Sequence, residues 1–348
     1  MGDLLSYSGI TTKVRAMESH LITDSQFREM AALETVSDAE EYLRRLPAYE
    51  GLFANLEGVV LHRGAIEQRL ILSLYQDFAK LYRFATLTQR KFLDLYFMHF
   101  EIDILKKCFR NSMGRNRLDI DLSVFQDFFE KHSKLDLMKL SSSADLREFI
   151  ANLEGSVYYD LLSHLDDRDQ PTLFDYEVHL DLLYFKTMWK VMGKYLTRKE
   201  QELLTHCFGS KLDLLNIQWI YRTKKYYHLQ PADIYSLLIP INYHLNREQI
   251  TKMAETATLE EFFSVLRTTF YGRKSDWDAA DMPNLEYLTQ EVLDKIYRSS
   301  SRQNPYSIAT LNSYLYFKEE EIQKIITLIE SIRYRVSPDE IISYVVKM

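Results

Sequence analysis

Apolar residues recur along the chain at the spacing of an α-helix. A first stripe falls on one face at 3.6 residues per turn and consists of Leu70, Leu74, Phe78, Leu81 and Tyr82. After residues 85–88, a second stripe consists of Phe92, Leu95, Tyr96, His99, Ile102 and Phe109. The two stripes predict two long helices that fold back on each other as an antiparallel hairpin.

The same pattern returns after about 110 residues, and once more after about 110 further residues. The segment that begins at Phe97 reads FxxxEIxIL, and its counterparts begin at Cys207 and Phe317. Upstream, IEQRL (66–70) recurs as YEVHL (176–180), whereas the third counterpart, at residues 285–286, is one residue out of register. Ordered recurrence at a fixed period is typical of tandem structural repeats. We therefore expect three copies of one helical module, at residues 1–118, 119–229 and 230–348.

Each copy also opens with a signal for the start of a helix. Residues 37–40 have the form of a capping box, in which a hydroxyl and a carboxylate satisfy free backbone amides before an apolar stripe begins. Counterparts of this box begin at Ser143 and at Thr258. A tyrosine follows shortly afterwards in every copy, at Tyr49, Tyr158 and Tyr271.

Two further features concern the later copies. Pro231 and Pro338 occupy corresponding places in the last two copies, and each is followed by acidic residues. Proline suits the first turn of a helix, so a new helix is predicted to begin at each. The serine-rich segment 299–304 is predicted to be an exposed loop inside the third copy.

The composition favours an all-α fold. The chain has 10 glycines and 7 prolines in 348 residues, about 3% and 2%, where average chains contain about 7% and 5%, which disfavours turn-rich β architectures. Cys108 and Cys207 lie in apolar helical stripes and outside any CxxC pattern. We expect buried, inert thiols there rather than a disulfide or a zinc site.

Charge and hydropathy limit the partners. The formal net charge is −7, which is the opposite of the basic surface that general nucleic-acid binders carry, so no nucleic acid is expected. The N-terminus lacks the basic and apolar stretches of a secretory signal, and the longest apolar run, residues 237–241, is far shorter than the roughly 20 residues of a membrane span. We expect a cytoplasmic protein without a span of its own.

The sequence contains no recognisable catalytic motif. Residues 272–275 lack the upstream glycine of a phosphate-binding loop, and no GxSxG elbow occurs. Asp166 to Asp169 is similar to the carboxylate cluster of magnesium-dependent helical enzymes, but its spacing is wrong for DDxxD and favours a solvated acidic turn. His99 and His206 lie on helical faces, where a structural role is expected. We therefore predict no catalytic residues, no cofactor and no metal.

Positive charge collects at corresponding points of the three copies. The second long helix of each copy ends in a cluster of cations. The clusters are Lys106, Lys107, Arg110, Arg115 and Arg117 in the first copy, Arg222, Lys224 and Lys225 in the second, and Arg333 and Arg335 in the third. One interpretation is that they stabilise helix C-termini, at about 0.3–1 kcal/mol each. The other is that they form a docking surface for an acidic or carbonyl-rich partner.

Several segments together carry a resemblance to a known family. They are Lys13-Val-Arg-Ala-Met17 with His20-Leu-Ile22 near the N-terminus, and Asn304-Pro-Tyr306, Tyr316 to Ile322, Ile332-Arg-Tyr334 and Ser337 to Ile341 near the C-terminus. With the three units of about 110 residues, they make the chain resemble the C subunit of the bacterial and archaeal V-type ATPases, the counterpart of the eukaryotic d subunit.

The resemblance implies a funnel of three similar helical domains about a pseudo-threefold axis. It also implies a non-catalytic central-stalk protein, peripheral on the cytoplasmic face of the membrane. Such a protein links the shaft made by the D and F subunits to the membrane rotor ring of proteolipid and transmits torque for proton or sodium transport. Arg15 and the basic residues named above are then candidate interface residues. Two alternatives stay open: a soluble helical-repeat scaffold for other proteins, and a metal-dependent enzyme that uses the Asp166 cluster.

Overall fold

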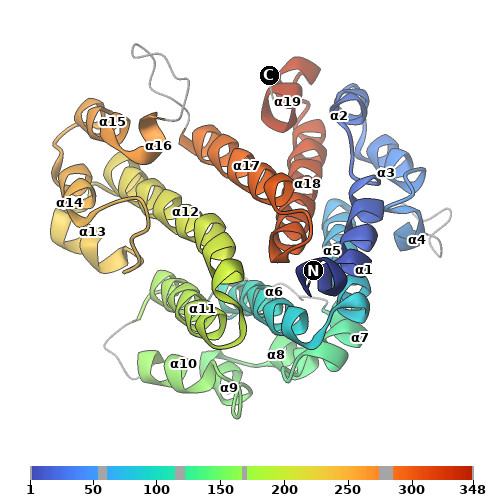
Figure 1. The fold of residues 1–348 in the computed structure, drawn as a ribbon, viewed down its shortest axis with the longest axis horizontal. Helices are drawn as coiled ribbons and strands as arrows, with labels where there is room; N and C mark the ends of the chain where they lie inside the picture. The colour runs from blue at the N-terminus through green and yellow to red at the C-terminus, as the bar shows by residue number, and fades with distance from the viewer. Residues whose placement is uncertain (1, 54–60, 114–121, 167–170, 274–284, 347–348) are drawn as a thin grey trace. The chain divides into compact units, whose positions relative to one another are not determined.

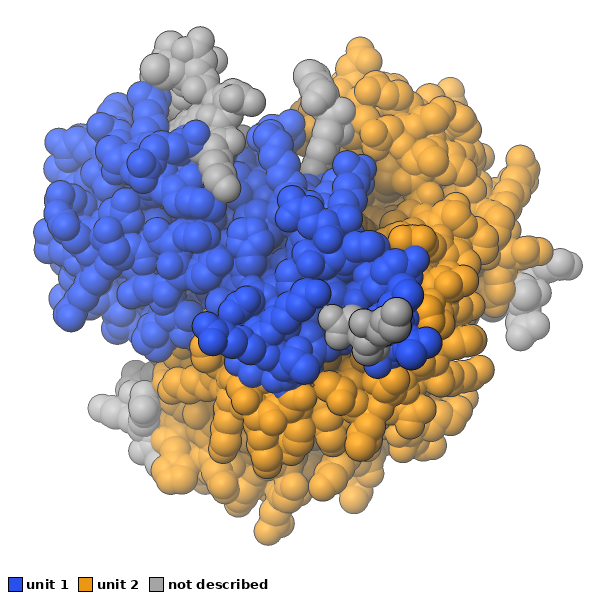
Figure 2. Space-filling view, viewed as in Figure 1, with its two compact units in different colours: residues 1–7, 196–313 blue, residues 8–195, 314–348 orange. Residues whose placement is uncertain are grey.

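The structure is a computed structural model that describes residues 2–53, 61–113, 122–166, 171–273 and 285–346. Within these ranges every regular element is a helix, which confirms the predicted all-α class (Figure 1). The chain divides into two compact units, one of residues 1–7 and 196–313 (unit 1) and one of residues 8–195 and 314–348 (unit 2) (Figure 2). Helices α1 (Gly2–Glu18) and α18 (Ile308–Arg333) each contribute residues to both units.

The predicted hairpin of two long helices is present in unit 2. Helix α5 (Arg63–Phe84) ends and α6 (Leu87–Met113) begins where the two apolar stripes are separated, and both stripes supply the buried face. Before this hairpin come three short helices: α2 (Asp24–Ala31), α3 (Val36–Arg44) and α4 (Glu50–Phe53). Helix α7 (Ser123–His132) follows it.

This order of short and long helices recurs along the chain. The second series has short helices α8 (Leu137–Ser142), α9 (Leu146–Ala151) and α10 (Tyr159–Asp166), the long helices α11 (Leu173–Tyr195) and α12 (Arg198–Arg222), the π-helical turn η1 (Thr223–Tyr227) and α13 (Pro231–Leu237). The third has α14 (Arg247–Glu255), α15 (Leu259–Thr268), α16 (Phe270–Arg273), the long α17 (Leu285–Gln303) and α18, and the short α19 (Pro338–Val345). The order agrees with a tandem module, while the boundaries at 118 and 229 remain a prediction.

Two of the predicted helix starts are displaced in the structure. The N-cap of α3 is Thr35, which forms a capping box with Asp38, so the expected box at residues 37–40 is wrong by two residues. The N-cap of α9 is Asp145 rather than Ser143. At α15 the predicted Thr258 does cap the helix, by accepting a hydrogen bond from the amide of Glu261. All these side chains are good caps, so only the docking of the following helix selects among them.

The predicted loop at residues 299–304 is also wrong. Helix α17 continues to Gln303, and Ser300 is buried. Serine is a neutral residue in a helix interior, so packing against a neighbouring helix decides its conformation. Here α17 packs along α12, and the two helices lie side by side within unit 1 (Figure 1).

The two predicted proline starts are confirmed. Pro231 and Pro338 occupy the first turn of α13 and α19. Three residues before each proline, the backbone takes the left-handed conformation, with φ of 50° at His228 and 57° at Arg335. The two segments therefore share a backbone geometry as well as a sequence pattern.

Candidate functional site

Three carboxylates on the long helices, of which Asp213 and Glu321 are buried and Glu101 is half-buried, hold tyrosines from other parts of the chain. Each carboxylate lies on α6, α12 or α18, and each tyrosine is the one that the sequence pattern singled out in every copy. The hydroxyl-to-carboxylate distances are 2.6 Å for Tyr158 to Glu101, 2.7 Å for Tyr271 to Asp213 and 2.5 Å for Tyr49 to Glu321. A hydrogen bond to a charged group contributes about 1.5–3 kcal/mol to stability, so each contact strengthens the packing of the two segments that it connects.

The same carboxylates also hold the segment that precedes the next short helices. Glu101 accepts a hydrogen bond from the Ser133 hydroxyl, and Glu321 accepts one from the Ile22 amide at 2.5 Å. Asp213 accepts three, from the amides of residues 243–245, at 3.1, 2.6 and 3.0 Å. One acidic side chain thus fixes two segments of chain. Burial raises the pKa of Glu101, and the hydrogen bonds that it accepts oppose this rise.

The three joints form a cyclic order in terms of the sequence copies. The tyrosine of the second copy binds the long helix of the first, and that of the third binds the helix of the second. Tyr49, in the first copy, binds Glu321 in the third, across 272 positions of sequence. Each joint lies inside one of the two compact units. We call these contacts the three carboxylate joints.

One joint contains a buried lysine that sequence reasoning missed. The Lys318 side chain is 1% exposed, and its ammonium donates to the Tyr49 hydroxyl and to Glu321 Oε1, both at 2.8 Å. The positions 110 and 220 residues earlier are occupied by buried Phe208 and Met98. The register of the repeat could have flagged this difference, because a charge replaces an apolar residue at one position of three.

The predicted cations of the first copy are paired with acidic residues of a neighbouring helix. Lys106 contacts Asp181 at 2.6 Å, and Arg110 contacts Glu177 at 2.7 Å. Both carboxylates belong to α11, which lies beside α6 within unit 2 (Figure 1). These cations therefore join two helices. The predicted Arg115 and Arg117 lie outside the described residues.

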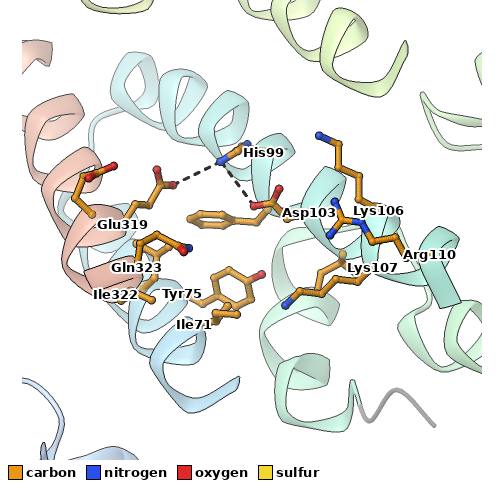
Figure 3. A pocket seen from close by; sticks show the side chains of 14 residues that line it. Ile71, Tyr75, His99, Asp103, Lys106, Lys107, Arg110, Glu319, Ile322 and Gln323 are labelled. Atoms are coloured by element: carbon orange, nitrogen blue, oxygen red, sulfur yellow. Dashed lines mark ion pairs between the residues drawn. The ribbon is translucent and has the colours of Figure 1, made fainter. Parts of the chain in front are cut away.

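A groove of about 370 Å³ opens beside these cations within unit 2. Lys106, Lys107 and Arg110 lie along one side of it, and Glu319 of α18 lies on the other (Figure 3). His99 lies between the two sides, with its Nε2 3.7 Å from Asp103 and 3.9 Å from Glu319. Burial lowers the pKa of Lys107. The groove can accept a partner that presents charges of both signs.

The cations of the second copy lie at the end of α12 and in η1. Lys224 donates to the Thr256 carbonyl at 2.5 Å, and burial lowers its pKa. Lys225 donates to the Tyr221 hydroxyl at 2.8 Å. Arg222 is exposed in the last turn of α12. Tyr226 and Tyr227, which follow, are both exposed.

The remaining predicted cations lie in unit 2. Arg333 ends α18 with its guanidinium 5.8 Å from the centre of the Tyr334 ring, and Arg335 follows in the left-handed conformation. Arg15 is exposed in the last turn of α1. Cations and exposed tyrosines thus accompany each other at two helix ends, as they do in many protein interfaces.

The groups considered for chemistry have structural partners. Cys108 and Cys207 are buried as predicted, and burial raises the pKa of each thiol to about 12. Asp166 accepts a hydrogen bond from Tyr176 at 3.2 Å, while residues 167–169 lie outside the described part of the chain. In the part that the structure describes, no three His, Cys, Asp or Glu side chains are grouped to hold a metal ion. Nor does any described helix have the length and apolar character needed to cross a membrane.

Comparisons with known proteins agree with one another. A family model described as ATP synthase (C/AC39) subunit matches residues 10–344. The C subunit of the A-type ATP synthase of Thermococcus kodakarensis is 26% identical over 97% of this chain and 90% of its own length. That of Pyrococcus abyssi is 24% identical over 96% and 89%, and that of Methanothermobacter thermautotrophicus is 20% identical over 95% and 85%.

Proposed function

Since the chain belongs to the ATP synthase (C/AC39) subunit family, we propose that it is the central-stalk component that links a D–F shaft to the membrane rotor ring. In this role it is a structural part of a rotary ATP synthase and not itself a catalyst. It lies on the cytoplasmic face as a peripheral protein and transmits torque, which couples ATP turnover to proton or sodium transport.

The carboxylate joints are the observation that supports this proposal most directly. A part that transmits torque must resist shear between its modules. Each joint combines a buried or half-buried carboxylate, a tyrosine hydroxyl and backbone or hydroxyl donors from another segment, so each joint consists of several hydrogen bonds. Because buried polar groups are costly to separate from their partners, such joints resist sliding more than apolar packing does.

The cyclic order of the joints supports a closed arrangement of three modules. Tyr49 belongs to the first module and Glu321 to the last, so their contact returns the chain to its beginning. The proposal includes the predicted domains 1–118, 119–229 and 230–348 and their pseudo-threefold funnel. In a closed arrangement each module is held by the other two, so no module can turn by itself under torque.

Two kinds of surface can serve the two partners. The groove beside α6 and α18 presents charges of both signs and suits the end of a shaft. The helix ends with Arg222, Lys225, Arg333 and Arg335 present cations beside exposed tyrosines and suit the carbonyl-rich loops of a ring. Arg15, Arg110 and Lys224 complete the proposed interface residues within the described ranges.

The proposal is tested by binding of the purified chain to an isolated D–F shaft and to an isolated rotor ring. We expect both to bind at low salt, and the ring to release as salt rises, since exposed charges are screened over about 8–10 Å. Absence of binding to both partners at low salt would reject the proposal.

Charge variants sharpen this test. The combined variant Arg222→Gln, Lys225→Gln and Arg333→Gln should weaken binding to the ring by about tenfold or more, because each exposed cation adds to attraction at a distance. Arg198→Gln is the matched control, since Arg198 is an exposed arginine that pairs with Glu202 on its own helix. A loss of binding free energy in the control that is one third of the loss in the combined variant would assign the effect to net charge alone, because the control removes one charge and the combined variant removes three.

A further inference from the structure

A second cavity of about 240 Å³ lies in unit 2, at the joint that contains Lys318. It is bounded by α1, α5 and α18 and by the segments that precede α2 and α4. The polar side chains that line it are Lys13, His20, Asp77, Lys80, Tyr314 and Lys318. Three lysines from three different helices therefore surround one small space.

Among the residues that the structure describes, two acceptors meet the three N–H donors of the Lys318 ammonium. An ammonium group has three N–H donors, and the structure gives Lys318 two acceptors, the Tyr49 hydroxyl and Glu321. The ring of Tyr49 lies 4.2 Å from the ammonium nitrogen, beside these bonds. Because removing a charge from water is costly, the buried ammonium needs a counter-charge, which Glu321 supplies at 2.8 Å, and its third N–H donor is then the one that a ligand could use.

Lys13 is a second cation whose N–H donors could bind a ligand. It is half-buried in the middle of α1. Its ammonium lies 5.7 Å from the centre of the Phe84 ring. Within the described residues no carboxylate pairs with it. Nothing in the described chain therefore neutralises this charge at close range.

The carboxylates around the cavity have their oxygens occupied. Asp77 Oδ1 contacts Lys80 at 2.8 Å, and Asp77 Oδ2 accepts the Tyr314 hydroxyl at 2.6 Å. Glu321 lies behind Lys318, where it accepts the joint's hydrogen bonds. Burial, Asp77, Glu321 and Glu18 together raise the pKa of Tyr314, so Glu18 is also part of these surroundings. Lys13 and one donor of Lys318 can therefore serve a ligand in the cavity, while Lys80 already donates to Asp77.

We propose that this cavity binds a phosphate-class oxyanion, held by Lys318 of α18 and Lys13 of α1 and assisted by the more exposed Lys80 of α5. A tetrahedral oxyanion accepts hydrogen bonds from several directions, which matches a cavity lined by one lysine from each of α1, α5 and α18. The source of the oxyanion is free phosphate or the phosphates of a nucleotide. This site concerns a ligand rather than the shaft or the ring, so it goes beyond the proposed function and does not depend on it.

A corresponding cavity in the same unit supplies a contrast. It has a volume of about 260 Å³ and lies at the joint of Glu101 and Tyr158. Its lining contains Asp94 and Glu101, its lysine, Lys134, is exposed, and the position that corresponds to Lys318 is Met98. Two carboxylates and an exposed lysine disfavour an anion there. Of these two joints, only the one with Lys318 therefore has the character of an anion site.

The experiment is titration of the full chain with inorganic phosphate, pyrophosphate and ADP by calorimetry, at ionic strength matched with sodium chloride. We expect saturable binding of phosphate and pyrophosphate, together with a rise in melting temperature that chloride does not give. Binding of ADP as well would identify a nucleotide source, and its absence would identify free phosphate.

Substitutions assign the site. Lys318→Met, which introduces the residue of the corresponding position, and Lys13→Gln should each weaken phosphate binding by about tenfold or more. Lys80→Met should weaken it less, and Lys91→Met is its matched control, because Lys91 has the same i,i+3 pairing, with Asp94, outside this cavity. If Lys318→Met fails to fold, the phosphate affinity of Lys13→Gln tests the proposal by itself.

Two results would overturn the proposal. One is a wild-type chain that responds to phosphate no more than to chloride at equal ionic strength. The other is folded Lys13→Gln and Lys318→Met variants that bind phosphate as tightly as the wild type, since binding would then occur elsewhere. Failure of the chain to bind a shaft or a ring would leave this proposal untouched.

Discussion

Arg335, two residues after the end of α18, adopts a conformation that favours glycine. Its φ is 57°, its amide donates to the Ile332 carbonyl at 2.9 Å, and the next amide, of Val336, donates to the Ser331 carbonyl at 3.0 Å. This pair of bonds is a Schellman motif, in which the left-handed residue is usually glycine because a Cβ is unfavourable there.

The first prediction is therefore that Arg335→Gly stabilises the chain. The left-handed conformation costs a residue with a Cβ about 1–2 kcal/mol, and the greater entropy of glycine in the unfolded chain offsets about 0.4–1 kcal/mol of this gain. We expect the free energy of unfolding in urea to rise by about 0.5–1 kcal/mol. Arg333→Gly, inside the last turn of the same helix, should lower it. A lower value for Arg335→Gly would show that its side chain makes contacts that outweigh the strain.

His132 gives a prediction about pH. It lies on α7 among aromatic rings, with centroids 4.8 Å from Phe128, 5.2 Å from Tyr82 and 5.6 Å from Phe78. Burial lowers its pKa below the usual value of 6.5. Asp94 opposes this shift, and Lys131 adds to it.

Because the folded chain binds the His132 proton less readily than the unfolded chain does, its stability falls as pH falls below about 6.5. His132→Phe removes this titration. We expect the free energy of unfolding of the wild type to decrease more steeply between about pH 7 and pH 5 than that of the variant. Parallel curves for the two proteins would contradict the expectation.

Residue-scale sequence reasoning located helix ends only approximately. Thr35, Ser37, Ser143 and Asp145 all have side chains that cap helices well, and the local sequence does not rank them. The structure uses Thr35 and Asp145. The choice depends on where the following helix must lie to bury its apolar face, which is information from outside the local window.

At the scale of elements, the carboxylate joints fix how the short helices pack on the long ones. Each joint closes over a long separation in sequence, between 57 positions for Tyr158 with Glu101 and 272 for Tyr49 with Glu321. Closing such large loops costs entropy, and the hydrogen bonds of each joint offset part of that cost.

A tyrosine series tests the strength of the joints. Tyr158→Phe and Tyr271→Phe each remove one hydrogen bond to a carboxylate, half-buried Glu101 or buried Asp213, at an expected cost of about 1.5–3 kcal/mol in the free energy of unfolding. Tyr49→Phe should cost more, because Lys318 also loses an acceptor. Chemical denaturation measures all three.

The control for this series is Tyr344→Phe. Tyr344 is an exposed residue whose hydroxyl contacts Glu340 at 2.6 Å one turn away on α19. Substitution at such a surface position should change stability by less than about 0.5 kcal/mol. If the buried and exposed substitutions cost the same, the joints do not hold the modules together.

At the scale of the whole molecule, the chain assembles unit 1 from distant segments. Residues 1–7 belong to it together with residues 196–313. Tyr7 is buried and donates a hydrogen bond to Glu200, and Glu200 in turn forms the capping box of α12 with Thr197. The first residues of the chain thus support the start of a helix nearly 200 positions later.

Deletion of residues 1–7 should therefore weaken unit 1 selectively. We expect faster hydrogen exchange in the first turns of α12, because the capping carboxylate loses a buried partner, while α5 and α6 in unit 2 keep their protection. Mass spectrometry of exchange in the full chain and in the truncated chain measures this difference. Uniform loss of protection, or none at all, would contradict it.

The sequence by itself determined the helical class, the paired long helices, the helix starts at Pro231 and Pro338, and the family. The helices follow from residues three or four apart, from proline positions and from the low glycine and proline content, which are local or statistical properties of sequence. The family follows from the resemblance of particular segments near the two ends of the chain together with the repeat. The tyrosines at 49, 158 and 271 were visible in this way, although their partners were not.

Only the tertiary structure decided which residues meet. It pairs Arg110 with Glu177, extends α17 through the serine-rich segment, and places Lys318 beside Tyr49 and a cavity. The physical reason is that these contacts join residues tens to hundreds of positions apart, so they depend on how whole helices pack and not on the spacing within any one of them.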